Sequence, residues 1–187
     1  MDRSLTHLGA SAIAELGAVL AALPDGAAEP LIEAILAARR IALYGAGREG
    51  LAIKGFAMRL FHMGRDAHVV ADMTTPPVGP GDLLIVTSGQ GHLATAEVLM
   101  DIAAAAGAKT AIVTAEPNGA TSRKADVRAV IPAQTMANDQ AGEVSVLPMG
   151  SLFEIAETIF FELVILKLRD RVGETAATMR ARHTNLE

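Results

Sequence analysis

Apolar positions recur every three or four residues in the first part of the chain, which predicts helices over 4–22 and 28–39. Pro24-Asp25-Gly26 separates these two helices. From residue 41 the pattern changes, and short apolar runs alternate with helical stretches. The short runs predict five buried strands, at 41–44, 67–70, 82–87, 110–114 and 127–131. The stretches between and after them predict further helices at 48–63, 92–106, 120–125, 151–170 and 174–182.

Strands that alternate with helices form a parallel sheet that is covered on both faces. We therefore predict an α/β fold, a three-layer α/β/α sandwich with a flavodoxin-like, five-stranded parallel sheet. The length of 187 residues fits a single domain over 1–187, with an N-terminal helical segment at 1–39 and C-terminal helices at 151–187. The N-terminal helices should pack on the sheet or on a partner subunit. The most loop-like segment, 132–148, contains Pro132, Gly142 and Pro148 and should cross one end of the sheet.

Composition and charge exclude several classes of protein. The net charge is -5 without a basic patch, which argues against nucleic-acid binding. The absence of cysteine rules out disulfides, thiolate catalysis and cysteine-ligated metals. The N-terminus lacks the apolar core of a signal peptide, and Glu162 interrupts the longest apolar run. We expect a cytoplasmic protein that binds neither a membrane nor a metal ion.

Ligands of open parallel sheets bind beyond the carboxyl ends of the strands. The segment that follows the first strand, Gly45-Ala46-Gly47-Arg48-Glu49-Gly50, fits the G-x-G-x-x-G pattern of dinucleotide-binding turns, and Asp72 has the spacing of a ribose-binding acid. Two features argue against a nicotinamide cofactor: helices at 1–39 precede the strand, and Asp72 lies past the end of the second strand. A tight turn that needs glycines is the simpler explanation.

A second glycine-rich turn, Thr87-Ser88-Gly89-Gln90-Gly91-His92, lies between a predicted strand and a helix. Free backbone N–H groups and the helix dipole favour an anion at such a turn. Ser88 and Thr95 would add hydroxyl groups. Two such turns at the same end of one sheet predict a ligand pocket there.

The order of these features resembles the SIS-domain family of phosphosugar isomerases and sugar-phosphate-sensing regulators. Three longer segments are similar to one branch, the 6-phospho-3-hexuloisomerases: Phe56-Ala57-Met58-Arg59-Leu60-Phe61-His62-Met63-Gly64, Leu147-Pro148-Met149-Gly150-Ser151-Leu152-Phe153-Glu154 and Met179-Arg180-Ala181-Arg182-His183-Thr184-Asn185-Leu186-Glu187. The resemblance runs from about residue 30 to the last residue. It implies a cofactor-independent isomerase that interconverts a 3-hexulose 6-phosphate and fructose 6-phosphate through a cis-enediol. It also implies a homotetramer with active sites near subunit contacts.

The resemblance carries roles over to individual residues. Glu154 would be the base that moves a proton between C2 and C3, although Ser151-Leu152-Phe153-Glu154 also has the spacing of a helix capping box. His183 would be its partner, reaching a neighbouring subunit's pocket, or else a solvated tail residue. Arg48 would stabilise the enediolate, or else be a solvated arginine of the first helical turn. His62 matches the family too, but a histidine at a helix end is equally consistent with the helix dipole.

Three positions depart from the family pattern of Gly-x-Gly-Arg-Ser-Gly and Ser-Gly-Ser-Gly-Glu-Thr. Glu49, Gln90 and Leu93 stand where the family has hydroxyl side chains. A carboxylate at 49 beside a phosphate dianion is unfavourable unless a cation compensates, and His92 would do so in part. Glu49 would instead suit sugar hydroxyls or point to solvent. The candidate substrate-binding residues are Gly45, Gly47, Glu49, Ser88, Gln90, Gly91, His92, Thr95 and His62.

Three functions stay open at this point. The first is a sugar-phosphate isomerase, the second an isomerase of an unphosphorylated or differently charged sugar, and the third a non-catalytic module that binds a sugar phosphate. The retention of Glu154 and His183 favours an enzyme. The helix at 151–168 is apolar on nearly all sides, which predicts a core position or an oligomer contact. We expect a homodimer or homotetramer.

Overall fold

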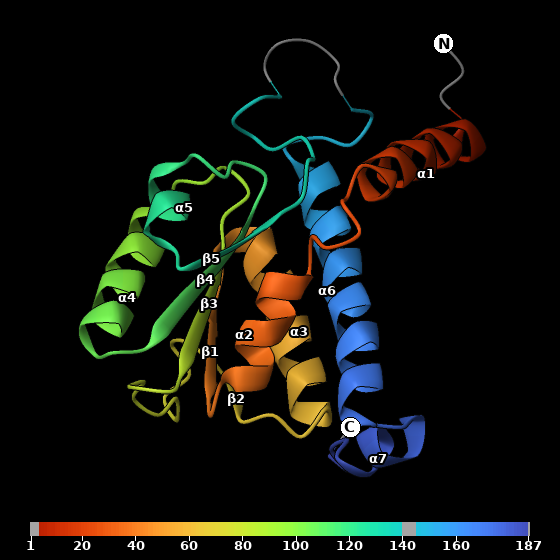
Figure 1. Ribbon diagram of the computed structural model, residues 1–187. Coiled ribbons are helices and arrows are strands. Elements are labelled where there is room, and N and C mark those ends of the chain that lie inside the picture. Colours follow the sequence, from red (N-terminus) through yellow and green to blue (C-terminus); the bar gives the residue numbers. More distant parts are fainter. Residues whose placement is uncertain (1–3, 140–144, 187) are drawn as a thin grey trace.

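One parallel sheet organises the structure (Figure 1). The computed structural model describes residues 4–139 and 145–186, so Gly142 of the predicted loop and Glu187 of the C-terminal motif lie outside it. The strands are β1 (Ile41–Tyr44), β2 (Ala67–Val69), β3 (Leu83–Thr87), β4 (Lys109–Thr114) and β5 (Val127–Val130). The helices are α1 (Leu5–Ala21), α2 (Glu29–Ala37), α3 (Gly47–His62), α4 (Ala94–Ala105), α5 (Ala120–Lys124), α6 (Ser151–Val172) and α7 (Ala176–Ala181). The predicted sequence of elements is confirmed.

The strand order is β2-β1-β3-β4-β5, and every neighbouring pair is parallel. Ile41 at the start of β1 pairs with Ala67 of β2 on one side and with Leu83 of β3 on the other. The chain therefore changes direction across the sheet between β1 and β3. Connections that leave these two strands diverge to opposite faces, which opens a crevice at their carboxyl ends.

The two faces of the sheet carry separate apolar cores, as the period of two along a strand requires. On β1, Ile41 and Leu43 belong to the cluster that also contains side chains of α2, α3 and α6. Ala42, between them, belongs to the cluster that contains side chains of α4 and Ala125, the residue that follows α5. Figure 1 shows α4 and α5 on one side of the sheet and α2, α3 and α6 on the other. The predicted three-layer sandwich is confirmed.

The two N-terminal helices differ in their packing. Leu31, Ile32 and Ile35 of α2 are fully buried against the sheet, as predicted. In contrast, α1 projects away from the body (Figure 1), and its Leu5 and Ile13 are 89% and 73% exposed. Packing of α1 on a partner subunit stays a prediction.

The long helix α6 packs along α3, where the rings of Phe56 and Phe161 stack with centroids 4.4 Å apart. Its buried side chains include Phe153, Phe160 and Val164, whereas Leu163 and Leu166 on its outer side are exposed. Of the two predicted positions for this helix, the core is the one observed, because α6 contributes buried side chains along its length, and an oligomer contact stays a prediction.

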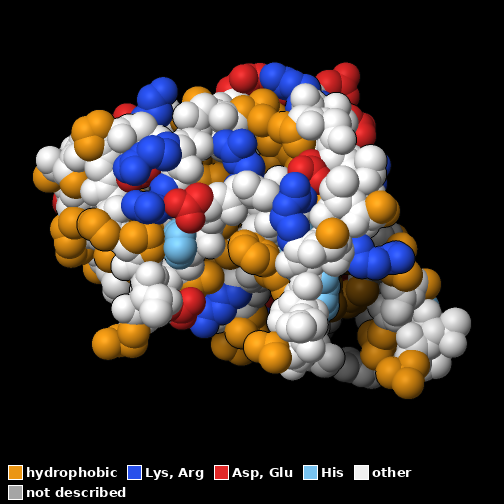
Figure 2. Space-filling model, turned by 90° about the horizontal axis from the view of Figure 1, so that it is seen from below, with side chains coloured by type: hydrophobic (Ala, Val, Ile, Leu, Met, Phe, Trp, Pro, Cys, Tyr) orange, Lys and Arg blue, Asp and Glu red, His pale blue; other side chains and the backbone are white. Residues whose placement is uncertain are grey.

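Figure 2 shows the face at the lower end of Figure 1, where lysine and arginine side chains lie interspersed with acidic and apolar ones. No continuous basic stripe, which is typical of a nucleic-acid-binding surface, crosses the described part of this face. Within the described residues, no helix has both the length and the apolar character that crossing a bilayer requires.

Candidate active site

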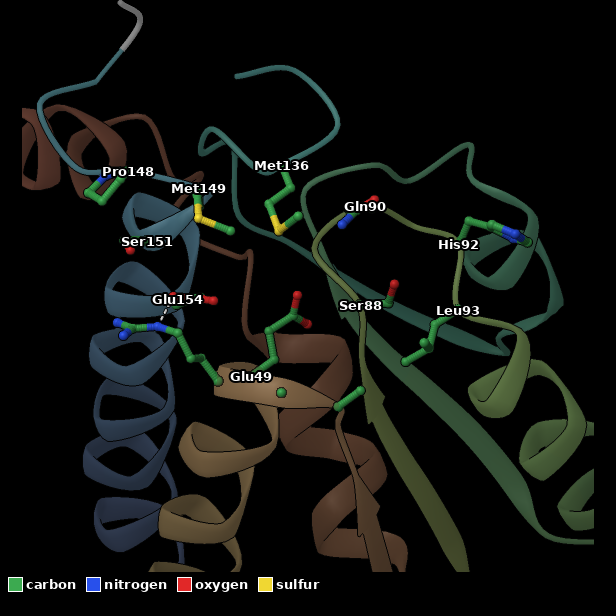
Figure 3. A pocket seen from close by; sticks show the side chains of 13 residues that line it. Glu49, Ser88, Gln90, His92, Leu93, Met136, Pro148, Met149, Ser151 and Glu154 are labelled. Carbon is green, nitrogen blue, oxygen red and sulfur yellow. Dashed lines mark hydrogen bonds and ion pairs between the residues drawn. The ribbon is translucent and has the colours of Figure 1, made fainter. Parts of the chain in front are cut away.

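A cavity of about 470 Å³ opens at the carboxyl ends of β1 and β3, where the sequence predicts a pocket. In Figure 3, Glu49 of α3 and Glu154 of α6 both point into it, Ser88 and Gln90 line its other side, and Met136 and Met149 lie above. The lining residues are Ala46, Gly47, Arg48, Glu49, Ser88, Gln90, His92, Leu93, Met136, Pro148, Met149, Ser151 and Glu154. Met136, which the sequence analysis did not single out, comes from the predicted loop at 132–148, as does Pro148, and Met149 follows that loop directly.

Gly45 and Gly47 shape the turn that brings α3 to the cavity. A Cβ atom at Gly45 would lie 2.6 Å from Cγ2 of Thr87, so glycine is required for the close approach to β3. Gly47 has a positive φ of 57°. Gly45 therefore serves packing, whereas Gly47 lines the cavity at the start of α3. Asp72 lies in the turn after β2 and does not line this cavity.

Glu154 lies in the first turn of α6, and its Oε2 accepts a hydrogen bond from Nε of Arg48 at 2.5 Å. The predicted capping box is wrong. The N-cap is Gly150, with φ 76°, and no side chain caps the helix. A Cβ atom at Gly150 would lie 2.8 Å from the backbone nitrogen of Met136, so the tight turn makes Ser151 the first helical residue instead of the cap. Glu154 is thereby left to face Arg48 and the cavity.

Glu49 does not point to solvent. Both of its carboxyl oxygens lie 3.1 Å from the backbone nitrogen of Gly89, whose N–H they accept. The hydroxyl of Thr87 lies 3.0 Å from Glu49 Oε2. Burial raises the pKa of Glu49, the donors Gly89 and Thr87 lower it, and the charge of Glu154 raises it, with a net shift upward. The carboxyl group of Glu49 thus accepts the backbone N–H of Gly89, which the predicted anion turn would otherwise offer to a ligand.

Glu157 is a site residue that the sequence analysis missed. It is 0% exposed, and its Oε1 makes a short hydrogen bond with the hydroxyl of Thr87. Burial, followed by the charge of Glu49, raises the pKa of Glu157 well above its ordinary value of 4.5. A glutamate on the buried face of an apolar helix is rare, which is the sequence signal that would have found it. Over residues 4–139 and 145–186, no group of three or more acidic or histidine side chains is placed to hold a metal ion.

The turn after β3 supplies the other wall of the cavity. Ser88 is 4% exposed, and Gln90 lines the cavity beside it. Gly91 has φ 66°, and a Cβ atom there would lie 2.5 Å from the carbonyl oxygen of Glu116, so it holds the turn's shape. His92 precedes the helix, and its Nδ1 lies 2.9 Å from Oε1 of Glu97. His92 lines the cavity, but its ring is directed toward that carboxylate instead of toward a bound anion.

Three predicted residues lie away from this cavity within the chain. Thr95 is exposed in the first turn of α4. His62 ends α3 and stacks on His183, with ring centroids 5.1 Å apart. This pair lies at the opposite end of α6 from Glu154, near α7 (Figure 1). Because a helix of 22 residues is about 33 Å long, His183 cannot reach the cavity of its own chain.

Comparisons with known proteins agree with this architecture. The family model described as SIS domain matches residues 34–156. The chain is similar to the 3-hexulose-6-phosphate isomerase of Bacillus subtilis (strain 168), with 37% identity over 97% of this chain and 98% of that protein. It is also similar to the 3-hexulose-6-phosphate isomerase of Methylomonas aminofaciens, with 34% identity over 94% and 96%.

A solved structure extends the comparison to three dimensions. A hypothetical protein of Methanococcus jannaschii, whose crystal structure is described as inferring a molecular function of 3-hexulose-6-phosphate isomerase, superposes with a TM-score of 0.79 at 27% identity. The match covers 97% of this chain and 98% of that one.

Proposed function

The chain belongs to the SIS-domain family, in the branch of the 3-hexulose-6-phosphate isomerases, and from this premise we propose that it is a phosphosugar isomerase. Its reaction interconverts a 3-hexulose 6-phosphate and fructose 6-phosphate through a cis-enediol, without a cofactor. The observation that carries the proposal is the position of Glu154 at the cavity, paired with Arg48 and opposite the turn after β3. The names of the relatives support the substrate class.

Glu154 is the base of the proposed reaction. Its side chain is 17% exposed and lines the cavity, where a substrate carbon can approach it. The carboxylate takes the proton from C3 of fructose 6-phosphate and returns it to C2. The guanidinium group of Arg48, which is bound to Glu154 through Nε and is 66% exposed, stabilises the enediolate oxygens as charge develops there.

The phosphate group binds at the turn after β3. Ser88 contributes a hydroxyl at the cavity wall, and Gln90 contributes an amide with two donors. Glu49 lies between this turn and Glu154, since Figure 3 shows it between Ser88 and Glu154. A sugar bound with its phosphate at the turn would therefore extend past Glu49 toward Glu154.

His183 acts in the cavity of a neighbouring subunit, within a homodimer or homotetramer. A shallow depression of about 370 Å³ next to the cavity is lined by α3 and α6 and shares Arg48 and Glu154 with it. Exposed apolar side chains, Leu51 and Met58 of α3 and Leu166 of α6, lie on these two helices. Burial of such a surface between copies would stabilise the oligomer and can bring His183 of a partner subunit to Glu154. The cytoplasm stays the predicted compartment.

One observation favours a second candidate. Because Glu49 occupies the N–H of Gly89, the turn after β3 offers less to a phosphate than a turn with free N–H groups. An isomerase of an unphosphorylated or differently charged sugar would use Glu49 as an acceptor for sugar hydroxyls.

Two substrates distinguish these candidates. The protein is incubated with fructose 6-phosphate and, separately, with free fructose, and carbon NMR follows the movement of the carbonyl from C2 to C3. Conversion of fructose 6-phosphate alone supports the first function, and conversion of free fructose alone supports the second. If neither sugar is converted by the folded protein, while fructose 6-phosphate binds, the enzyme proposal fails and a binding module replaces it.

A further inference from the structure

The hydroxyl of Thr87 lies between two carboxyl groups. Its oxygen is 3.0 Å from Oε2 of Glu49 and makes a short hydrogen bond with Oε1 of Glu157. A hydroxyl has one hydrogen and can donate to only one of these two groups. The other carboxyl group must therefore donate to Thr87, which means that it carries a proton.

Burial identifies Glu157 as the protonated group. Its side chain is fully buried, and its Oε2 has no hydrogen-bond partner among the described residues. An ionised carboxylate in such surroundings is strongly disfavoured. A protonated Glu157 donates to Thr87, so that the hydrogen of Thr87 is directed to Glu49.

The titratable groups near this pair lie on α3, α4 and α6 and in the turn after β3. Glu49 and Glu154 act on Glu157 through their charges, from α3 and α6. Arg48 of α3 pairs with Glu154. His92, from the turn after β3, pairs with Glu97. Burial and the charge of Glu154 raise the pKa of Glu49, so that it keeps a proton at a higher pH than an exposed glutamate does.

We propose that Glu49 is a second acid–base group of the reaction, which moves a proton between the two sugar oxygens while Glu154 moves a proton between the two carbons. Three observations carry this inference, which rests on the proposed isomerase function. Glu49 and Glu154 point into the same cavity (Figure 3). Gly89 and Thr87 both donate to Glu49 and stabilise its anion after it has given up its proton. Glu49 lines the cavity of its own chain, whereas His183 could enter a cavity only from a neighbouring subunit.

The proton transfers balance in both halves of the reaction. Starting from fructose 6-phosphate, ionised Glu154 takes the proton from C3, and protonated Glu49 gives its proton to O2. The resulting enediol is neutral. Ionised Glu49 then takes the proton from O3, and protonated Glu154 gives its proton to C2. Both glutamates return to their starting states, and the carbonyl has moved from C2 to C3.

A neutral Glu49 also accounts for the carboxyl group in an anion turn. When Glu49 carries its proton, it adds no negative charge beside a substrate phosphate. The departure of this chain from the family pattern at position 49 is therefore compatible with a phosphorylated substrate.

Glu49→Gln tests the proposal because glutamine keeps the size of the side chain but cannot exchange protons. The protein is incubated with fructose 6-phosphate in D2O, and NMR measures both deuterium entry at C3 and net conversion to the 3-hexulose. Without a group that moves the proton from O3 to O2, an enediolate formed by Glu154 returns to C3. We expect conversion to fall by about a hundredfold and exchange by less than about tenfold, so that the ratio of exchange to conversion rises. Glu49→Asp, which keeps a titratable group, should restore part of the conversion.

A purely structural role for Glu49 predicts that exchange and conversion fall in proportion, and an unchanged ratio would overturn the proposal. Glu162→Gln is the matched control, because Glu162 is an exposed residue of α6 that pairs with Arg59. It should leave both rates at wild-type values. If the wild-type protein itself neither exchanges nor converts fructose 6-phosphate, the proposed function fails. If the wild type does both and Glu49→Gln keeps its ratio, only the role of Glu49 fails.

Discussion

The carboxyl group of Glu49 is bound by the backbone N–H of Gly89, with both oxygens 3.1 Å from the nitrogen. This contact joins the first turn of α3 to the turn after β3, and both segments line the cavity. An internal carboxyl group thus occupies a position where the turn would otherwise offer an N–H group to a ligand anion. The ionisation of Glu49 therefore sets the charge that a substrate meets there.

Removal of this carboxyl group should change substrate binding in a pH-dependent way. Glu49→Ser frees the N–H of Gly89 and removes a negative charge that Glu49 carries once it loses its proton. The Kd for fructose 6-phosphate, measured by titration calorimetry, should fall by at least about threefold where Glu49 is ionised, and by less as the pH is lowered and Glu49 takes up its proton. An increase of the Kd at high pH would contradict the assigned position of the phosphate.

Glu157 should make the stability of the protein depend on pH. Its pKa is raised in the folded state by burial, so the folded protein keeps a proton that the unfolded chain releases above the ordinary value of 4.5. The stabilisation is complete below that value and is lost as the pH rises through the folded pKa, at up to about 1.4 kcal/mol per pH unit. Glutamine at position 157 does not titrate. The free energy of unfolding of Glu157→Gln, measured in urea, should therefore fall less steeply with rising pH than that of the wild type above about pH 5.

The control for this measurement is Glu162→Gln on the same helix, which should keep the wild-type slope. Equal slopes in the wild type and in Glu157→Gln would show that Glu157 is ionised in the folded protein, against the assignment made here.

Gly89 should not tolerate a side chain. A Cβ atom there would lie 2.7 Å from the ring of Phe153, which is buried at the start of α6. Gly89→Ala should lower the free energy of unfolding by about 1–3 kcal/mol through overpacking. Gly17→Ala in α1, where a Cβ atom meets nothing within 4 Å, should be neutral or slightly stabilising. Chemical denaturation of both variants checks the difference, and equal stabilities would contradict the packing described.

A shared active site predicts that two inactive variants complement each other. Glu154→Gln lacks the base, and His183→Ala lacks the group that a partner subunit is proposed to supply. In oligomers assembled from equal amounts of both, about a quarter of the sites combine an intact Glu154 with an intact His183. Activity should recover to about that fraction of the wild type. Light scattering that shows a monomer, or mixed oligomers without activity, would contradict the shared site.

The fold could be predicted from the sequence because the burial of each element follows from its local pattern. The runs at 41–44 and 83–86 are apolar throughout, since strands of a parallel sheet are covered on both faces. The position of the cavity could also be predicted from the sequence, because the turns that follow parallel strands all lie at the same edge of the sheet. These inferences needed no knowledge of which side chains meet.

The contacts that support the cavity wall could not be predicted, because they join residues far apart in the chain. Thr87 meets Glu49 and Glu157 only after β3, α3 and α6 have packed together. The capping prediction for Ser151 failed because it considered the local spacing alone, whereas the left-handed Gly150 and its approach to Met136 set the start of α6.

The assignment of Glu154 as the base is the central claim, and hydrogen exchange tests it most directly. Wild-type protein and Glu154→Gln are incubated with fructose 6-phosphate in D2O, and NMR follows deuterium entry at C3. We predict exchange by the wild type and a loss of at least about a hundredfold in Glu154→Gln, with the variant folded and the Glu162→Gln control unaffected. Exchange by Glu154→Gln at the wild-type rate would show that another group removes the proton and would contradict the mechanism.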